Sequence, residues 1–182
     1  MIDLANTPVL ETERLTLRAP KGADWPVWRD FYMTDRAQYC GGGADITLGH
    51  AWRSFGHVIG HWAMRGYGSF VFTLKGDDAP LGMTGPWHPA DWPETEIGWT
   101  VWTPEAEGRG YAFEAAHAAR DFARNTLGWT DIVSYIDLAN ARSIALAERL
   151  GAVRDTAATG PGDNTCLVYR HPVPGPDPEA RA

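Results

Sequence analysis

The second half of the chain alternates strand-like and helix-like segments at spacings that restrict the fold more than any other feature. We expect strands over residues 95–102, 131–136 and 165–170, with an Ala-rich helix inside 103–126 and a second helix over 140–150. A strand that follows a crossover helix of this length joins the sheet parallel to the strand before that helix. The sequence therefore predicts an α/β fold with a mixed sheet and at least one parallel pair of strands.

The first half of the chain has the pattern of antiparallel strands with two helices between them. Leu15 and Leu17 alternate with polar residues, as in a half-exposed strand. Asp24 followed by Pro26 is typical of the N-cap and first turn of a helix. The expected elements are a strand over 13–20, helices over 24–35 and 48–65, and strands over 69–74 and 81–85 that form a meander with 95–102.

The length and composition suit one folded domain. The chain has 182 residues, of which 44% are hydrophobic and 21% are charged, so it can bury a core of its own. We assign residues 1–171 to that domain and expect residues 172–182, with four prolines, to be disordered. Because no apolar run nears about 18 residues and residues 1–10 lack the pattern of a signal peptide, we expect a cytoplasmic protein with no membrane contact.

Charge and ligand spacing argue against two kinds of site. The net charge of −7 disfavours a nucleic-acid-binding surface. Cys40 and Cys166 stand too far apart for a metal motif. His50, His57 and His61 lie on one expected helix, but no neighbouring carboxylate completes a metal site. We therefore expect these histidines to form a polar helix face.

The turn after the strand over 95–102 contains two glycines, Gly108 and Gly110. Glycine tolerates positive φ, so successive backbone N–H groups here can converge on an anion at the helix N-terminus, where the helix dipole adds attraction. Arg109 could lend a side-chain charge to the same anion. Taken alone, a Gly-x-Gly pair is also typical of an ordinary turn.

Two segments resemble the signatures of one enzyme family. Residues 107–112, Glu-Gly-Arg-Gly-Tyr-Ala, resemble the acyl-CoA pyrophosphate loop of the GNAT N-acetyltransferases, Gln/Arg-x-x-Gly-x-Gly/Ala. Residues 140–152 are similar to the second family signature, which begins Asn-x-x-Ser and ends Gly-Phe/Ala, and the two segments stand in the family's order. Residues 11–18 resemble the first strand of the Rim-type branch, which acetylates the N-termini of ribosomal proteins, so the resemblance covers residues 11–171.

This resemblance implies a fold, a reaction and a set of cofactor contacts. The fold is a mostly antiparallel sheet flanked by helices, with a central parallel pair of strands splayed to admit acyl-CoA. The reaction is direct transfer of an acetyl group from acetyl-CoA, without a metal, to a primary amine on a protein N-terminus or a small molecule. The cofactor-binding residues that it implies are Gly98, Trp99, Thr100, Glu107, Gly108, Arg109, Gly110, Tyr111, Ala112 and Asn140.

Glu107 departs from the family pattern, because an acid replaces the Gln or Arg beside a polyanion. Backbone N–H groups form most of such a cradle, so binding survives if the Glu107 side chain points to solvent. The departure leaves open a second hypothesis, a non-catalytic acyl-CoA-binding or sensor protein of the same fold. A Rossmann-type nucleotide enzyme is disfavoured because the turn has no third glycine.

Glu96 is the expected general base. Alternation along the strand over 95–102 places Glu96 on the same face as Gly98 and on the face opposite to Ile97. A glycine within a strand indicates a bulge or a close backbone approach, and in the family main-chain groups meet the pantetheine and the thioester there. The alternative is that Glu96 is an exposed strand carboxylate in a salt bridge.

Asn140 and Ser143 stand at the start of the helix over 140–150. Asn is among the best helix N-caps, and that role is compatible with a cofactor contact. By resemblance, Asn140 would touch the pantetheine arm and Ser143 would protonate the leaving thiolate. Many family members use a tyrosine a few residues after this asparagine, and this chain has none there.

Aromatic residues gather between the strands over 81–85 and 95–102. A loop rich in tryptophan and acidic residues can enclose a cationic amine between ring faces and carboxylates. We therefore predict that the acceptor amine binds near Trp87, His88, Trp92 and Glu94. The alternatives are ordinary loop packing and a contact between the two copies of a homodimer.

Overall fold

The computed structural model describes residues 4–162 and 165–173. The tail expected to be disordered therefore lies outside the described residues from position 174 onward. None of the helices in the described ranges is long and apolar enough to cross a bilayer.

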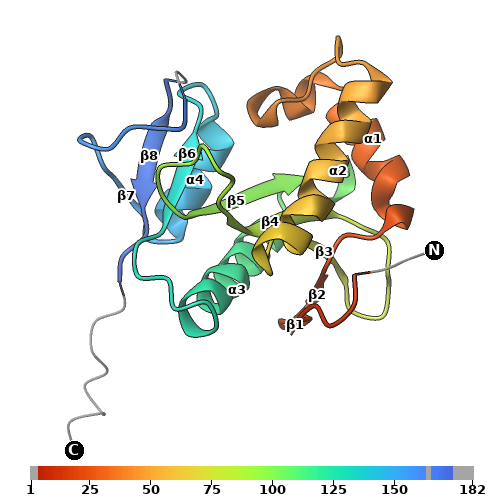
Figure 1. The fold of residues 1–182 in the computed structure, drawn as a ribbon, viewed down its shortest axis with the longest axis horizontal. Coiled ribbons are helices and arrows are strands. Elements are labelled where there is room, and N and C mark those ends of the chain that lie inside the picture. The colour runs from red at the N-terminus through yellow and green to blue at the C-terminus, as the bar shows by residue number, and fades with distance from the viewer. Residues whose placement is uncertain (1–3, 163–164, 174–182) are drawn as a thin grey trace, which may run out of the picture.

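A single mixed sheet runs through the described part of the chain (Figure 1). Its strand order is β1-β2-β3-β4-β5-β6-β8-β7, and every neighbouring pair is antiparallel except β5 and β6. The mixed sheet, the meander and the parallel pair predicted from the sequence are confirmed. The strands are β1 (Leu10–Glu11), β2 (Leu15–Arg18), β3 (Phe70–Leu74), β4 (Gly82–Trp87), β5 (Glu96–Val101), β6 (Val133–Ile136), β7 (Val153–Arg154) and β8 (Leu167–Arg170).

Four α-helices cover the two faces of this sheet in the described ranges (Figure 1). The helices are α1 (Trp25–Tyr32), α2 (Leu48–Arg65), α3 (Tyr111–Asn125) and α4 (Ala141–Arg149), with 3₁₀ turns at Gly22–Asp24, Asp35–Cys40 and Pro104–Ala106. Helices α1 and α2 pack on one face, where Trp28 and Phe55 meet Val71 and Trp102. Helices α3 and α4 pack on the other face.

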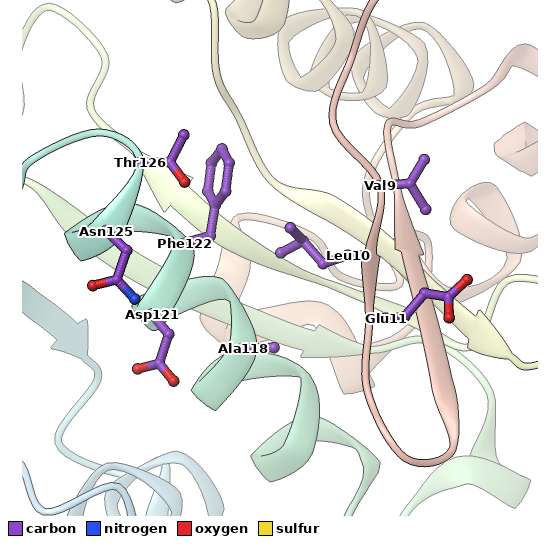
Figure 2. A pocket seen from close by; sticks show the side chains of 8 residues that line it. All are labelled: Val9, Leu10, Glu11, Ala118, Asp121, Phe122, Asn125 and Thr126. Carbon is purple, nitrogen blue, oxygen red and sulfur yellow. The ribbon is translucent and has the colours of Figure 1, made fainter.

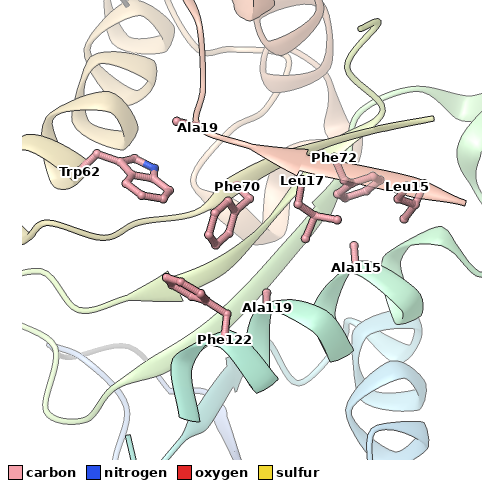
Figure 3. Close-up of a cluster of buried hydrophobic side chains, with 9 residues drawn as sticks. All are labelled: Leu15, Leu17, Ala19, Trp62, Phe70, Phe72, Ala115, Ala119 and Phe122. Atoms are coloured by element: carbon pink, nitrogen blue, oxygen red, sulfur yellow. The ribbon is translucent and has the colours of Figure 1, made fainter. Parts of the chain in front are cut away.

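The core beneath α3 shows why the chain forms these layers. Leu15 and Leu17 on β2, with Phe70 and Phe72 on β3, point from alternate strand positions toward the helix (Figure 3). Their partners on α3 include Ala115 and Ala119, whose small side chains let the helix lie close to the sheet. Phe122 of α3 then meets Phe70 edge to face, with ring centroids 5.3 Å apart. Period-two strands and an Ala-rich helix therefore build one continuous core.

Two local expectations need correction. Asp24 stands at the N-cap position of α1, but its carboxylate accepts hydrogen bonds from the buried Arg18 guanidinium at 2.8 and 2.9 Å and does not cap the helix. The helix ends at Tyr32, three residues before the expected end, and a separate 3₁₀ turn follows over Asp35–Cys40. A buried ion pair with Arg18, six residues earlier in the chain, thus replaces the helix cap, because burying Arg18 requires a charged partner.

The sequence predicts that His61 lies on a polar helix face, and the structure shows that this prediction is wrong. It is buried, its Nδ1–H donates to the Tyr67 carbonyl at 2.9 Å, and its Nε2 accepts from the His88 backbone N–H at 3.1 Å. Burial lowers the pKa of His61, so the ring is neutral. His61 is therefore a structural link between α2 and the segment after β4.

The sequence predicts a bulge or a close backbone approach at Gly98, and on the side of β4 the structure shows neither there. The register between β4 and β5 runs without interruption from Gly82 opposite Val101 to Trp87 opposite Glu96. The close backbone approach occurs instead at Gly85, whose φ is 150° and where an added Cβ would lie 2.9 Å from the Ser69 Cα. The irregular edge of β5 is the edge that faces β6.

Candidate active site

Strands β5 and β6 separate soon after they meet. In the described chain they pair at one position, Glu96 opposite Val133, where the Val133 N–H donates to the Thr95 carbonyl at 2.9 Å. We call the stretch in which β5 from Gly98 and β6 from Tyr135 part the strand fork (Figure 1). Because main-chain groups alternate in direction along a strand, those of Trp99 point toward the fork. An extended ligand can pair with that edge.

Glu96 lies at the closed end of the strand fork and is only 9% exposed. One carboxylate oxygen accepts from the Trp92 indole N–H at 2.5 Å and the other from the Tyr135 backbone N–H at 3.4 Å. Burial raises the pKa of Glu96 to about 7, and these two donors offset part of that rise. A carboxyl group with this pKa can take up or release a proton near neutral pH. Glu96 is thus buried and bonded to neutral donors, and it is not an exposed strand carboxylate.

Ser143 and Asn140 meet at the start of α4. The Asn140 side-chain oxygen accepts from the Ser143 backbone N–H at 3.2 Å, so the N-cap role expected for Asn140 is confirmed. The Ser143 Oγ accepts from the Trp99 indole N–H at 3.2 Å. Trp99 therefore ties α4 to β5 across the strand fork. The Ser143 hydroxyl remains able to donate its own proton, because the indole only donates.

The turn before α3 has the geometry of an anion site. Gly108 and Gly110 have φ of 70° and 80°, and Gly110 immediately precedes the helix. The first N–H groups of a helix have no partner inside it, so those of Tyr111 and Ala112 are directed at the turn. Arg14 steadies the segment, because its guanidinium donates to the Arg109 carbonyl at 3.1 Å and lies 4.8 Å from the centre of the Tyr111 ring. The residues present fit a pyrophosphate group.

Glu107 binds two arginines and does not point freely to solvent. Its carboxylate accepts from Arg36 at 2.6 and 3.1 Å and from Arg142 at 2.6 Å. Arg36 also donates to the carbonyls of Val101 and Trp102, so it joins the end of β5 to the turn. The hydrogen bond from Arg36 is the main cause of the lowered pKa of Glu107. Glu107, which departs from the family pattern, therefore holds the guanidinium groups of Arg36 and Arg142 beside the turn.

The aromatic segment between β4 and β5 hydrogen-bonds to Glu96 through one residue, and its other predicted acceptor-binding residues have other partners. Trp92 reaches Glu96 directly, and its carbonyl accepts from the His88 ring at 3.2 Å. Trp87 stacks on His61 with ring centroids 4.3 Å apart. Glu94 is held by the Arg170 guanidinium at 2.7 and 3.1 Å. Of the four residues predicted to bind the acceptor, Trp92 donates a hydrogen bond to the expected base, and Trp87 lies opposite it in the strand register.

Two surface hollows lie away from Glu96 and Ser143. One of about 440 Å³ lies between β1 and α3 and is lined by residues such as Leu10 and Phe122 (Figure 2). The other, of about 320 Å³, lies beside α1 and is lined by Arg36 and Trp102 among others. Neither is lined by a residue predicted to act in catalysis.

The arrangement of turn, strand fork and helix agrees with a known domain. A model of the Acetyltransferase (GNAT) domain matches residues 14–153, which is more than half of the chain. The chain belongs to the GNAT acetyltransferase family. An acetyltransferase from Agrobacterium tumefaciens is 38% identical in sequence, over 94% of this chain and 98% of that one, with a TM-score of 0.84.

Two further solved structures share the GNAT fold at lower identity. RimL, a ribosomal-protein alpha-N-acetyltransferase solved with coenzyme A, is 17% identical over 91% of this chain and 98% of its own, with a TM-score of 0.68. Spermidine N-acetyltransferase from Vibrio cholerae, solved with CoA and spermine, is 17% identical over 87% and 94%, with a TM-score of 0.64. The resemblance and fold class expected from the sequence are confirmed, and this GNAT protein is an acyl-CoA-dependent acetyltransferase.

Replacing Gly110 by valine is expected to weaken CoA binding more than about tenfold, equivalent to ~1.4 kcal/mol. Gly110 has φ of 80°, which a β-branched residue rarely adopts, and the added side chain would stand where the N–H groups meet the anion. Calorimetric titration with CoA measures the effect. Gly76→Val is the matched control, because Gly76 has φ of 79° and open space around it, far from the turn in sequence. Equal CoA affinity in the two variants would contradict this placement.

Replacing Glu107 by glutamine is expected to tighten CoA binding a few-fold at low salt, by about 0.5 to 1 kcal/mol. The change removes the negative charge beside the turn and leaves Arg36 and Arg142 in place for an anion. Titrations at low and high salt measure it. Glu105→Gln makes the same charge change at an exposed position two residues away and serves as the control. Weaker binding in Glu107→Gln would instead show that holding the two arginines outweighs the charge.

Proposed function

We propose that this enzyme transfers an acetyl group from acetyl-CoA directly to a primary amine. The observation that carries the proposal is the position of Glu96, a buried carboxyl group with a pKa of about 7, at the closed end of the strand fork. The anion-binding turn stands at the other end of β5, and Ser143 stands across the fork. An acyl donor anchored at the turn and extended along β5 would bring its thioester close to both side chains.

The donor would be held mainly by main-chain groups. The N–H groups of Tyr111 and Ala112, with the Arg109 side chain, would bind the pyrophosphate, and Gly108 and Gly110 would shape the turn. The edge of β5 over residues 98–100 would pair with the pantetheine arm, beside Asn140. When bound, acetyl-CoA supplies a thioester carbonyl that an amine can attack.

Two side chains would then move protons. Glu96 takes a proton from the ammonium form of the acceptor, which exposes the amine lone pair for attack on the carbonyl carbon. As the carbon–sulfur bond breaks, the Ser143 hydroxyl donates its proton to the departing sulfur and regains one from solvent or from Glu96. The attacking nitrogen loses its second proton to solvent as the amide forms, so the products are an amide, free CoA thiol and one released proton, and no covalent enzyme intermediate forms.

We place the acceptor on the Glu96 side of the sheet, next to Trp92. The indole of Trp92 lies against the base, and Trp87 and His88 belong to the same segment. Ring faces of this kind suit an ammonium group before it loses its proton. RimL acts on a ribosomal protein and the Vibrio cholerae enzyme acts on spermidine, so both a protein N-terminus and a small amine are candidates. We further propose that the enzyme acts in the cytoplasm.

An acceptor panel tests the proposal. Acetyl-CoA is incubated with the protein and with short peptides of free N-terminus, the same peptides with a blocked N-terminus, spermidine, and single amino acids. We expect thiol release above the hydrolysis rate with at least one class of amine, and the acetylated product by mass. A protein that binds acetyl-CoA but releases no thiol with any amine would instead be an acyl-CoA sensor.

A further inference from the structure

The hydrogen-bond ladder between β5 and β6 is ended by side chains. In a continuing parallel ladder, the bond after Val133 N–H to Thr95 would run from the Tyr135 N–H to the Ile97 carbonyl, two residues farther on each strand. Instead, the Tyr135 N–H meets the Glu96 carboxylate at 3.4 Å, and the Ile97 carbonyl accepts from the Ser134 hydroxyl at 2.6 Å. Ser134 thus occupies the acceptor that would draw the strands together.

A buried chain of hydrogen bonds fixes the Ser134 hydroxyl. The Ile97 carbonyl can only accept, so Ser134 donates its one proton there and accepts from the His171 Nε2–H at 3.0 Å. The bare Nδ1 of His171 then accepts from the Arg120 guanidinium at 3.5 Å. Arg120 itself also donates to the Leu150 carbonyl at 2.5 Å. In the three bonds that lead from Arg120 through His171 and Ser134 to Ile97, each proton is donated in the direction of β5. This pattern requires that His171 carries its proton on Nε2 and not on Nδ1.

Burial and charge keep this chain intact near neutral pH. Ser134 is 1% exposed and His171 is 2% exposed. Burial lowers the pKa of His171 to about 3, and Arg120 adds to the shift, so the ring stays neutral. A second ring proton would face the Arg120 guanidinium, which is itself only a donor. This series of hydrogen bonds connects α3, His171 directly after β8, and both strands of the fork.

We propose that Ser134, oriented by His171, is a positioning residue that holds the strand fork open for the acyl donor. With the Ser134 hydroxyl on the Ile97 carbonyl and the Tyr135 N–H turned to the Glu96 carboxylate, Tyr135 and Ile97 do not pair, and the Trp99 main chain stays unpaired on that edge. The Tyr135 N–H is left to hold the Glu96 carboxylate. The inference relies on the proposed function for the identity of the ligand, and it extends it by naming the residues that keep the cofactor edge free.

Ser134→Ala tests the inference. The variant frees the Ile97 carbonyl for the Tyr135 N–H, so β5 and β6 can pair one step farther and close part of the edge. We expect the Kd for CoA and the KM for acetyl-CoA to rise about tenfold, the size of one hydrogen bond lost to the ligand, and kcat at saturation to change less than about threefold. We also expect slower hydrogen exchange at the Tyr135 amide of the CoA-free variant. Wild-type CoA affinity in Ser134→Ala would overturn the inference, whatever the exchange rate at Tyr135.

Two comparisons separate positioning from simple stability. Thr73→Val removes a hydroxyl that is equally buried, at 1% exposure, on β3 away from the fork, and it should leave CoA affinity unchanged. His171→Gln retains an N–H that can donate to Ser134, whereas His171→Leu does not. We expect near wild-type CoA binding in the glutamine variant and the Ser134→Ala defect in the leucine variant. This pair carries the test if Ser134→Ala does not fold, and equal CoA affinity in both would also overturn the inference.

The CoA titration separates this inference from the proposed function. Binding of CoA requires no acceptor amine, so the effect of Ser134→Ala can be measured even in a protein that acetylates nothing. Absence of thiol release from the wild-type protein would reject the proposed function alone. A fork that binds CoA equally well with and without the Ser134 hydroxyl would reject this inference alone.

Discussion

Replacing Ser143 by alanine is expected to lower kcat about 10²-fold while CoA affinity stays nearly unchanged. The proton donated to the leaving sulfur stabilises the transition state and not the bound donor, so its loss should affect turnover alone. The Trp99 indole that meets Ser143 has no acceptor lone pair, so it cannot pass on a proton and regain one, and it does not replace the missing hydroxyl. Steady-state rates at saturating acetyl-CoA, with a CoA titration alongside, measure both quantities.

Ser143→Thr is the matched control for this prediction, because it keeps a hydroxyl at the same helix position. We expect threonine to retain most of the turnover that alanine loses. A fall in kcat of less than about threefold in Ser143→Ala would show that Ser143 is not the proton donor and only occupies the start of the helix. Loss of a proton donor lowers kcat far more than this. A parallel loss of CoA affinity would place Ser143 in binding instead of proton transfer.

Replacing Glu96 by glutamine is expected to lower kcat/KM at least about 10²-fold and to remove the acidic limb of the pH–rate profile. The wild-type rate should fall as the pH drops below the Glu96 pKa of about 7, because the protonated carboxyl cannot accept the ammonium proton. An amide has no such titration, so the residual rate of the variant should lack this limb. Profiles of kcat/KM for the acceptor from pH 5 to 9, with acetyl-CoA saturating and the acceptor varied, make the comparison.

The same substitution has an opposite consequence for stability. The pKa of Glu96 is raised from its usual value of 4.5 to about 7 in the folded protein, so the folded state binds more protons than the unfolded state between these values. Stability of the wild-type protein therefore falls as the pH rises through this window. The Glu96→Gln variant should gain on the wild-type protein by up to about 3 kcal/mol between pH 4.5 and 8, as measured by chemical unfolding.

Glu94→Gln is the control for both parts of the Glu96 prediction. Glu94 stands two residues earlier in the chain, and its carboxylate forms a salt bridge with the Arg170 guanidinium. We expect the acidic limb to persist in that variant. An unchanged limb in Glu96→Gln together with a lost limb in Glu94→Gln would move the base to Glu94.

Much of the fold follows from local signals in the sequence. Leu15 and Leu17 alternate, two glycines mark the turn before α3, and Asn140 caps α4, and each of these features depends on neighbours only a few residues away. Strands β1 and β7 escape prediction because two residues are too few to show a period.

The site depends on partners that sequence spacing cannot reveal. Glu107 lies 71 residues from Arg36 and 35 residues from Arg142 in the chain, yet it binds both. Ser134 meets the Ile97 carbonyl and the His171 ring 37 residues away on either side. Local sequence patterns do not predict such pairs, because their members are far apart in the chain and become neighbours only through the topology of the sheet. The acidic Glu107 appears unfavourable in the sequence for the same reason, since its cations lie elsewhere in the chain.

The central claim is direct transfer of acetyl from acetyl-CoA to an amine by an enzyme that carries no acetyl group itself. A single-turnover experiment tests it most directly, with acetyl-CoA below the enzyme concentration and the best amine of the panel, quenched at short times. We predict equal amounts of free thiol and acetylated amine at every time point, with the mass of the protein unchanged. An acetylated protein that forms before the product, or bound acetyl-CoA that persists in the presence of the amine, would contradict the claim.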